Sequence, residues 1–240
     1  MSAAKFLALS FAVMMTMAPG AEAARTEVAV HVLSQDAKLI GSGVGGAWVT
    51  VADAGTGEVL AQGAHEGSTG DTRVIMRQQP QQRDTVLFDS EGAASFLAVF
   101  DIDEPTVIRI TAVGPLGNPD AGMRASTDML VTPGARVLGD GVVLTLHGLN
   151  IRILETGAAV AGKSMRLLVN VGMMCGCPLT PGGLWDADTV ALTARLLGEA
   201  SHFDGEITPP AAGAYTLEII GEQPGKANFG RARAPLSVAP

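Results

Sequence analysis

The segment GAYTLEIIGEQPGKANFGRARAPLSV, residues 213–238, contains two extended stretches on either side of a polar loop. The loop is rich in Gly, Pro and Asn, which are residue types that turns prefer. Two strands joined by such a loop form a β-hairpin. The end of the chain therefore predicts a closing hairpin and, with it, a β-sheet fold.

The rest of the C-terminal half has the same character. Short apolar segments alternate with breaks at Gly, Pro, Asn and Asp. Segments of this length and composition predict strands rather than helices. The predicted strands are VVLTLHG (142–148), LNIRILET (149–156), SMRLLVNVGM (164–173) and TVALTARLLG (189–198).

The N-terminal half repeats this pattern. The segment AWVTVAD (47–53) alternates apolar and polar residues, and the turn AGTG (54–57) joins it to EVLAQG (58–63), as in a hairpin. Strand signals at such regular spacing predict an all-β sandwich or barrel. The other predicted strands are TEVAVHVL (26–33), TRVIMR (72–77), TVLFD (85–89), ASFLAVFD (94–101) and TVIRITAVG (106–114).

A Pro/Gly- and Asp/Gly-containing stretch, VTPGARVLGDGV (131–142), interrupts the strand pattern near the middle of the chain. Given the usual size of a domain, we expect two β-sandwich domains, residues 24–132 and 142–240, joined by a linker at 133–141. The second domain contains the segment Met-Met-Cys-Gly-Cys-Pro. The alternative is one large sandwich.

Two segments resemble known domain types. Tyr215 follows Pro209, Pro210 and Gly213, and in this the last hairpin resembles that of immunoglobulin-like domains. The segment WVTVADAGTGEVLAQG (48–63) resembles carboxypeptidase-regulatory-like or transthyretin-like domains. The resemblance to such bacterial exported β-sandwich domains implies a tandem immunoglobulin-like/transthyretin-like fold, and it implies no activity.

The first 23 residues have the pattern of a secretory signal peptide. Lys5 precedes an apolar run at 6–18, which is followed by Pro19-Gly20 and by Ala21-Glu22-Ala23. A short basic region, an apolar core and a small-x-small site are the parts of such a signal, and the run is too short to span a bilayer. We expect cleavage after Ala23 and a periplasmic or secreted protein. The alternative is a buried N-terminal helix.

The charge and composition of the chain argue against some classes of binding partner. The net charge is −8, and the sequence contains no run of basic residues. Nucleic acid and anionic lipid are therefore not expected to bind, and no membrane insertion is expected after signal cleavage. The sequence also lacks a Gly-x-Ser-x-Gly elbow, a His-Glu-x-x-His motif and a helix with paired carboxylates. No catalytic residues are assigned, and a role in binding another protein is favoured over catalysis.

Residues 157–164, GAAVAGKS, match the nucleotide-binding pattern G-x-x-x-x-G-K-S. In a P-loop the glycines expose backbone N–H groups to phosphate, the lysine reaches the terminal phosphates, and a helix follows. Here the segment MRLLVNVGMM and a Gly-Cys-Pro break follow, which leaves no room for a helix and a crossover. We interpret the match as a hairpin loop and expect no nucleotide.

The two cysteines, Cys175 and Cys177, lie in GMMCGCPLTPGG (172–183). If the preceding strand stays extended, Met173 lies on the same face as both cysteines. Three sulfur ligands suit a soft ion such as Cu(I), with His202 or another methionine as a fourth ligand. The first hypothesis is therefore an exported copper-binding accessory protein.

Two other readings of the cysteines stay open. A Cys-x-Cys disulfide closes a small ring that is easily reduced, so the pair would serve a thiol–disulfide redox protein. In the remaining reading the methionines fill the core and the cysteines form a structural tie. The protein would then be a non-catalytic interaction module that uses its sheet edges or the loop at 179–188.

Overall fold

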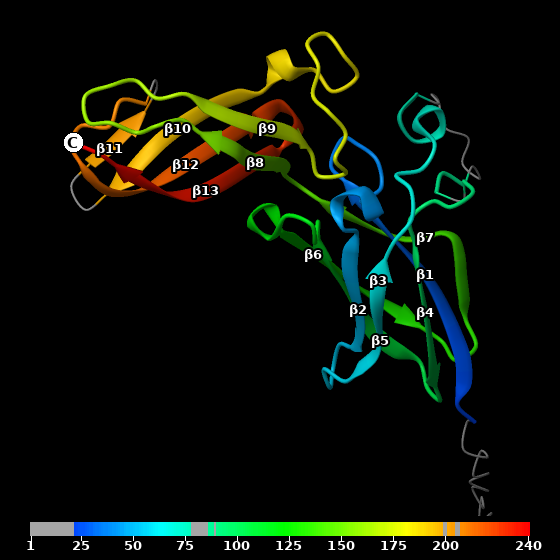
Figure 1. Cartoon of the computed structure of the whole chain (residues 1–240). Coiled ribbons are helices and arrows are strands. Elements are labelled where there is room, and N and C mark those ends of the chain that lie inside the picture. The colour runs from blue at the N-terminus through cyan, green and yellow to red at the C-terminus, as the bar shows by residue number, and fades with distance from the viewer. Residues whose placement is uncertain (1–21, 78–85, 89, 199–200, 205–206) are drawn as a thin grey trace, which may run out of the picture.

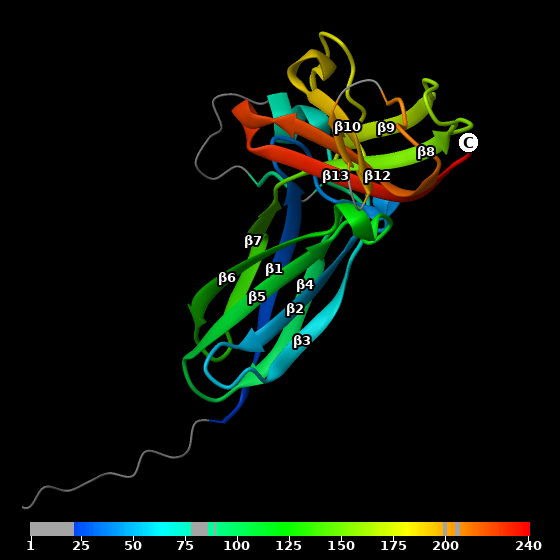
Figure 2. The same cartoon turned by 90° about the vertical axis from the view of Figure 1, so that its left-hand side faces the viewer.

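The structure is a computed structural model that describes residues 22–77, 86–88, 90–198, 201–204 and 207–240, with the side chains of residues 77, 198 and 201–204 left aside. The described chain is nearly all β, as the sequence predicts. It forms two lobes that meet at an angle (Figures 1 and 2). The predicted signal peptide at residues 1–23 lies almost entirely outside the described residues, and only its last two residues fall within them.

The N-terminal lobe has two sheets. Their strand orders are β4-β1-β7 and β3-β2-β5-β6, and β7 pairs in parallel with β1. The strands are β1 (Ala24–Ser34), β2 (Ala47–Asp53), β3 (Val59–His65), β4 (Phe96–Ile102), β5 (Thr106–Gly114), β6 (Met123–Val131) and β7 (Arg136–Leu146).

Alternation along these strands builds the core of the lobe. From Thr26 onward, every second residue of β1 is fully buried. Val28, Val30 and Val32 are the apolar members of this set, and they pack with apolar side chains of β2 and β5 such as Val49 and Ile110. Side chains two apart on a strand point to the same face, so one apolar face per sheet is sufficient to form a sandwich-like interior.

The C-terminal lobe places a two-stranded hairpin against a four-stranded sheet of order β11-β10-β12-β13. The hairpin is β8 (Leu149–Thr156) and β9 (Leu167–Met173). The sheet is formed by β10 (Ala191–Gly198), β11 (Ser201–Asp204), β12 (Gly213–Gln223) and β13 (Asn228–Val238). The closing hairpin predicted from residues 213–238 is confirmed, because β12 and β13 pair over their whole length.

Short helical turns complete the fold. They are η1 (Ser42–Val44), the π-helical turn η2 (Arg73–Arg77), η3 (Pro119–Ala121), η4 (Ala187–Thr189) and η5 (Pro224–Lys226).

The segment 72–77 was predicted as a strand, and this is wrong: it forms η2. The Asp71 side chain accepts hydrogen bonds from the backbone N–H groups of Arg73 (2.7 Å) and Val74 (3.4 Å), which satisfies the first turn of a helix.

Residues 86–88, part of another predicted strand, are also not a strand. The backbone N–H groups of Leu87 and Phe88 bond instead to the Asp140 carboxylate.

The predicted linker at 133–141 contributes the start of β7, which pairs with β1 from Glu27↔Arg136 onward. The chain passes from one lobe to the other at His147 and Gly148. Gly148 has a φ of 155°, and its N–H donates to the Asn228 side chain at 3.0 Å. The two lobes are therefore joined by a short, hydrogen-bonded crossing rather than by a separate linker.

Candidate functional site

The sulfur loop, residues 172–178, closes tightly after β9. The Met173 N–H donates to the Cys177 carbonyl at 2.9 Å, and the Gly176 N–H donates to the Met173 carbonyl at 2.8 Å. Gly176 has a φ of 79°, a conformation that glycine adopts without steric penalty. The strand therefore ends at Met173, and the premise that it stays extended through Cys177 is wrong.

The two neighbouring methionines of the sulfur loop enter different cores. Met173 packs with Cys175 and Cys177 in the core of the C-terminal lobe. Met174 belongs to the core of the N-terminal lobe, and both methionine side chains are 0 % exposed. Met174 therefore points away from the cluster of Met173 and the two cysteines, and the turn gives it this orientation.

Cys175 and Cys177 form a disulfide with each other, and both are buried. In this state neither sulfur is a thiolate, which is the form that binds soft metals. Among the described residues there is no group of three or more His, Cys, Asp or Glu side chains that would hold a metal ion. His202 lies in β11, and its side chain is outside the described part of the chain. The copper site at Met173, Cys175, Cys177 and His202 stays a prediction.

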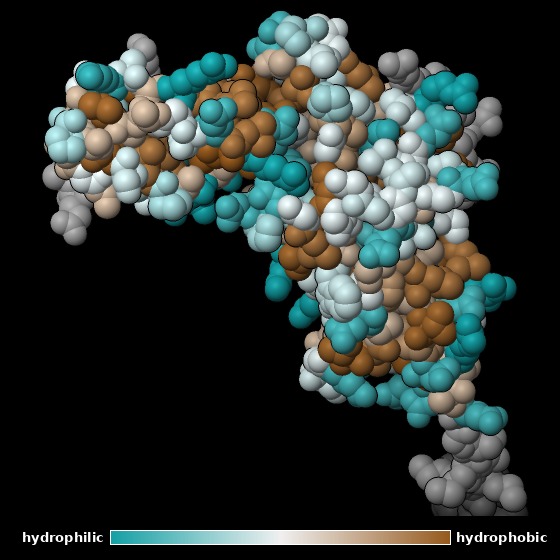
Figure 3. Space-filling view, viewed as in Figure 1, coloured by the Kyte–Doolittle hydropathy of each residue, from teal (hydrophilic) through white to brown (hydrophobic). Residues whose placement is uncertain are grey.

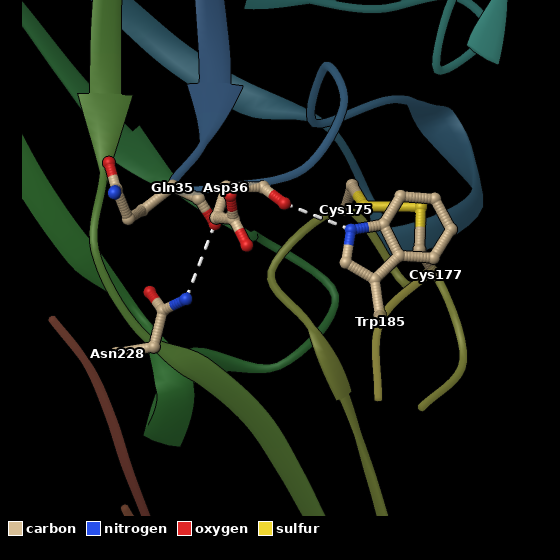
Figure 4. Close-up of a disulfide and its surroundings, with 6 residues drawn as sticks. All are labelled: Gln35, Asp36, Cys175, Cys177, Trp185 and Asn228. Carbon is tan, nitrogen blue, oxygen red and sulfur yellow. Dashed lines mark hydrogen bonds between the residues drawn. A yellow bond between two sulfur atoms is a disulfide. The ribbon is translucent and has the colours of Figure 1, made fainter. Parts of the chain in front are cut away.

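The loop at 179–188 covers the disulfide with Trp185, whose indole ring lies beside the two sulfur atoms (Figure 4). The indole N–H crosses to the other lobe and donates to the Asp36 carbonyl at 2.9 Å. The carboxylate of Asp186 holds this loop by accepting from the Gly182 and Asp188 N–H groups. Trp185 thus both shields the sulfur loop and ties the lobes together.

Further contacts fix the junction between the lobes. The fully buried Asn228 side chain donates to the Gln35 carbonyl at 3.3 Å (Figure 4). It also donates to the Gln223 side chain at 3.2 Å. Lys226 pairs with the Asp36 carboxylate at 3.2 Å. Because the buried Asn228 side chain has its hydrogen-bond partners in place, it stabilises this arrangement of the two lobes. Separating the lobes would remove these hydrogen bonds.

A third set of contacts lies at the turn before η3. The Asn118 side chain donates to the Asn150 side chain (2.7 Å) and to the Ile151 carbonyl (3.0 Å), both on β8. Arg152 also donates to the Gly117 carbonyl at 3.2 Å. These contacts seat η3 against the C-terminal lobe.

On the inner side of the angle between the lobes lies an open cavity of about 600 Å³, here called the elbow groove. Figure 3 shows this concave corner, where hydrophilic and hydrophobic residues lie side by side. The N-terminal lobe contributes η3 and the start of β6, and the C-terminal lobe contributes the outer face of its sheet. The lining residues are Asp120, Gly122, Met123, Arg195, Glu218, Ile220, Phe229, Gly230, Arg231 and Arg233.

A buried carboxylate organises the floor of the elbow groove. Glu218 on β12 is 3 % exposed and lies between Arg195 of β10 and Arg233 of β13 in the strand register. Its two oxygens accept from Arg195 Nη2 at 2.7 Å and from Arg233 Nε at 2.8 Å. A carboxylate that accepts from two guanidinium groups fixes both arginines in place.

The structure also pairs two histidines that the sequence leaves scattered. His31 and His65 meet edge to face at 6.4 Å between ring centroids in the N-terminal lobe. His65 Nε2 accepts from the Val32 N–H and Nδ1 donates to the Ile40 carbonyl, so the neutral ring is satisfied. Burial lowers the pKa of His65 to about 4. Both rings thus serve as buried polar packing, and His147 is an exposed residue at the crossing.

The P-loop-like segment 157–164 connects the antiparallel strands β8 and β9, as the predicted hairpin loop requires. Its Gly157 N–H donates to the Arg166 carbonyl, and Lys163 N–H closes a turn onto Val160. No helix follows this segment before β9 begins at Leu167. The backbone N–H groups of Gly157 and Lys163 are therefore bonded within the loop and not turned outward as a phosphate cradle.

Comparisons of this chain with protein-family models, with curated protein sequences and with solved structures each found no match. Within the described ranges, the helical turns are all too short to cross a membrane.

Proposed function

We propose that this chain is an exported, non-catalytic binding protein that engages another protein in its elbow groove. The observation that carries the proposal is that both lobes line a single cavity of about 600 Å³ while several independent contacts hold the lobes at a fixed angle. Ligand sites commonly form at domain interfaces and have volumes of about 300–1,000 Å³. The junction contacts fix the two lobes relative to each other, and the groove between them is accessible. A partner can therefore bind between two walls whose positions are already set.

The chemistry of the groove favours binding over catalysis. Among the described side chains, those that line it include no Cys, His or Ser, and its buried carboxylate is engaged by two arginines. A general base needs a lone pair that is free to take a proton from the substrate, whereas both oxygens of Glu218 already accept from arginines.

The proposal also includes export of the chain and an immunoglobulin-like type for its domains. The first 23 residues supply a signal peptide that directs the chain to the periplasm or the medium. The tandem immunoglobulin-like interpretation gains support from Tyr215 near the start of β12, whose hydroxyl donates to the Ala211 carbonyl at 3.1 Å. A tyrosine that bonds back to the backbone a few residues upstream, on the penultimate strand, is typical of such domains.

The test is photocrosslinking in cells that export the protein. A photoreactive residue replaces Phe229 in the groove or, as control, Val59, which is an exposed apolar residue on β3 of the N-terminal lobe. We expect a discrete adduct with another protein from position 229 and none from position 59. Equal or absent adducts at both positions would refute use of the groove.

Soft-metal binding by the sulfur loop is a second candidate, because Met173 packs in one cluster with Cys175 and Cys177. Binding would require prior reduction of the disulfide, which takes up two electrons and two protons and gives two thiols. The reduced protein is then titrated anaerobically with Cu(I) against a chromogenic chelator. One equivalent bound by the native chain and none by the Cys175→Ser/Cys177→Ser variant supports this role.

The thiol–disulfide redox alternative is tested with the same protein. Equilibration in glutathione buffers gives the two-electron potential of the Cys175–Cys177 pair. A value well above that of inert structural disulfides, which lie below about −300 mV, supports redox exchange. A value in the inert range identifies the pair as a structural tie.

A further inference from the structure

We propose that the elbow groove recognises an extended acidic segment of a partner protein, in which an apolar side chain is followed at two-residue intervals by two carboxylates. This inference rests on the proposed function and specifies its ligand.

The order of the lining residues along β13 carries the inference. Phe229, Arg231 and Arg233 occupy alternate positions of one strand, and all three line the groove. Residues two apart on a strand are separated by about 6.6–6.8 Å, and an extended peptide lying along the strand has the same repeat. One apolar and two cationic positions on β13 therefore match one apolar and two acidic positions on an extended ligand.

The apolar end of the groove lies next to the junction. Met123 of β6 and the backbone of Phe229 approach the same point, since a Cβ placed on Gly148 would lie 3.6 Å from Met123 Cγ and 3.4 Å from the Phe229 carbonyl oxygen. The two side chains are 39 % and 49 % exposed. Large apolar side chains from two lobes at the corner of a cavity form a contact site for an apolar anchor residue.

The charge of the groove selects an acidic ligand. Three arginines line it against the carboxylates of Glu218 and Asp120, and Glu218 is already engaged by Arg195 and Arg233. Arg231 is exposed and, among the described residues, forms no ion pair. On a chain of net charge −8, this leaves a local cationic site whose free guanidinium is suited to bidentate contact with a carboxylate.

The arginine side chains and the two walls of the groove are already held in position before a partner binds. Glu218 holds two of the arginines in place, and the junction contacts of Asn118, Asn228 and Trp185 fix the two walls relative to each other. Binding then requires little ordering of the protein, and less of the interaction energy is lost to entropy.

The first experiment measures binding of fluorescein-labelled peptides to the full mature chain by fluorescence polarisation. The test peptide contains Leu-Thr-Asp-Thr-Asp between Gly-Ser flanks. One control peptide replaces both Asp by Asn, and another moves the two Asp next to each other. We expect saturable binding of the test peptide, weakened about tenfold or more in either control and by added salt, since tenfold in affinity corresponds to about 1.4 kcal/mol.

Variants of the protein locate the contact. Arg231→Glu is expected to weaken the test peptide about tenfold or more, and Arg231→Gln by a smaller factor. Lys163→Glu makes the same change of charge on an exposed loop outside the groove, and we expect an affinity within about twofold of the native chain. Thermal unfolding checks that each variant is folded.

Three outcomes would overturn the inference: no saturable binding of the test peptide, equal binding of the Asn peptide, or equal effects of Arg231→Glu and Lys163→Glu. If position 229 crosslinks to a partner in cells while no acidic peptide binds, the groove is a binding site for another chemistry and only this inference fails. An adduct with a second copy of this chain also refutes it. If neither crosslinks nor peptide binding occur, both proposals fail.

Discussion

The sulfur loop and the elbow groove lie on different parts of the same junction and have opposite character. The sulfur loop is closed: its two methionines are fully buried in separate cores, and its cysteines are bonded to each other. The groove is open and charged, and its lining comes from both lobes. The residues that look most reactive in the sequence thus lie buried in the two cores, while the open groove carries no recognisable motif.

The largest expected effect tests whether the sulfur loop is structural. Met174→Ala leaves a cavity in the core of the N-terminal lobe, and burying fewer atoms there is expected to reduce the free energy of unfolding by about 2–5 kcal/mol. Urea denaturation measures the change. Met123→Ala, at an exposed groove position, is the matched control with an expected loss below about 1 kcal/mol. Similar losses for both variants would remove the contrast between the two regions.

As the pH falls, protonation of the buried His65 is expected to reduce the stability of the fold before protonation of exposed carboxylates does. The neutral His65 ring is favoured in the folded state, where its pKa is about 4, whereas an unfolded histidine has the ordinary value of 6.5. Below pH 6.5 the unfolded chain takes up a proton that the folded chain refuses. Stability is therefore complete above about pH 6.5 and falls as the pH drops toward 4, by up to about 3 kcal/mol.

Urea midpoints at intervals from pH 7 to pH 4.5 measure this loss. His65→Gln lowers overall stability and should flatten the slope between pH 6.5 and 5. The exposed His147 provides the control, because His147→Gln is expected to keep the native slope. Carboxylates whose pKa is lowered by a neighbouring group, such as Asp128 beside Arg109, stabilise the fold down to about pH 4. Their protonation reduces the stability of the fold only below that pH, so it does not account for a loss between pH 6.5 and 5. A slope unchanged by His65→Gln would disprove the assignment.

Opening the disulfide is expected to have a smaller effect. The ring between Cys175 and Cys177 is short, so its loss restores little chain entropy to the unfolded state, about 1.5 kcal/mol. The Cys175→Ser/Cys177→Ser variant, compared with the oxidised native chain by thermal unfolding, measures this value. Trp185 fluorescence reports whether the covering loop stays in place. A loss as large as that of Met174→Ala would mean that the bond, and not the packing, holds the junction.

The smallest effect on stability is expected in the groove. Arg231→Gln removes an exposed charge that takes part in no ion pair among the described residues, so the free energy of unfolding should change by less than about 0.5 kcal/mol. Calorimetry checks this, while the peptide assay shows the loss of binding. A strongly destabilised Arg231→Gln variant would assign this residue a structural role.

The sequence predicted most strands because alternation of apolar and polar residues directly reflects burial on one face. Strand β6 was missed because its outward residues are nearly all exposed, and only Val131 is fully buried on its inner face. The segment 72–77 was misassigned because its packing is local: Ile75 lies against the small buried cluster that contains Leu39 and Phe88. The bonds to Asp71 also favour a helical turn.

The site was predicted only in part for a related reason. The position of the sulfur loop could be read from two cysteines one residue apart, but Met174 also reaches a core formed by residues far earlier in the chain. The groove joins Asp120 and Met123 to Arg195, Glu218 and Arg233, and no local pattern links positions so far apart.

The placement of Met174 also determines the order in which the protein can finish folding. All strands of the N-terminal lobe have been synthesised once the chain reaches Leu146, yet the lobe's interior is completed by a side chain that follows β9. Contacts between residues distant in the sequence slow folding, since the long loop must close before the contact is gained. A nascent chain that ends at Leu146 would hold both sheets of the first lobe and still have a gap in its core where Met174 belongs.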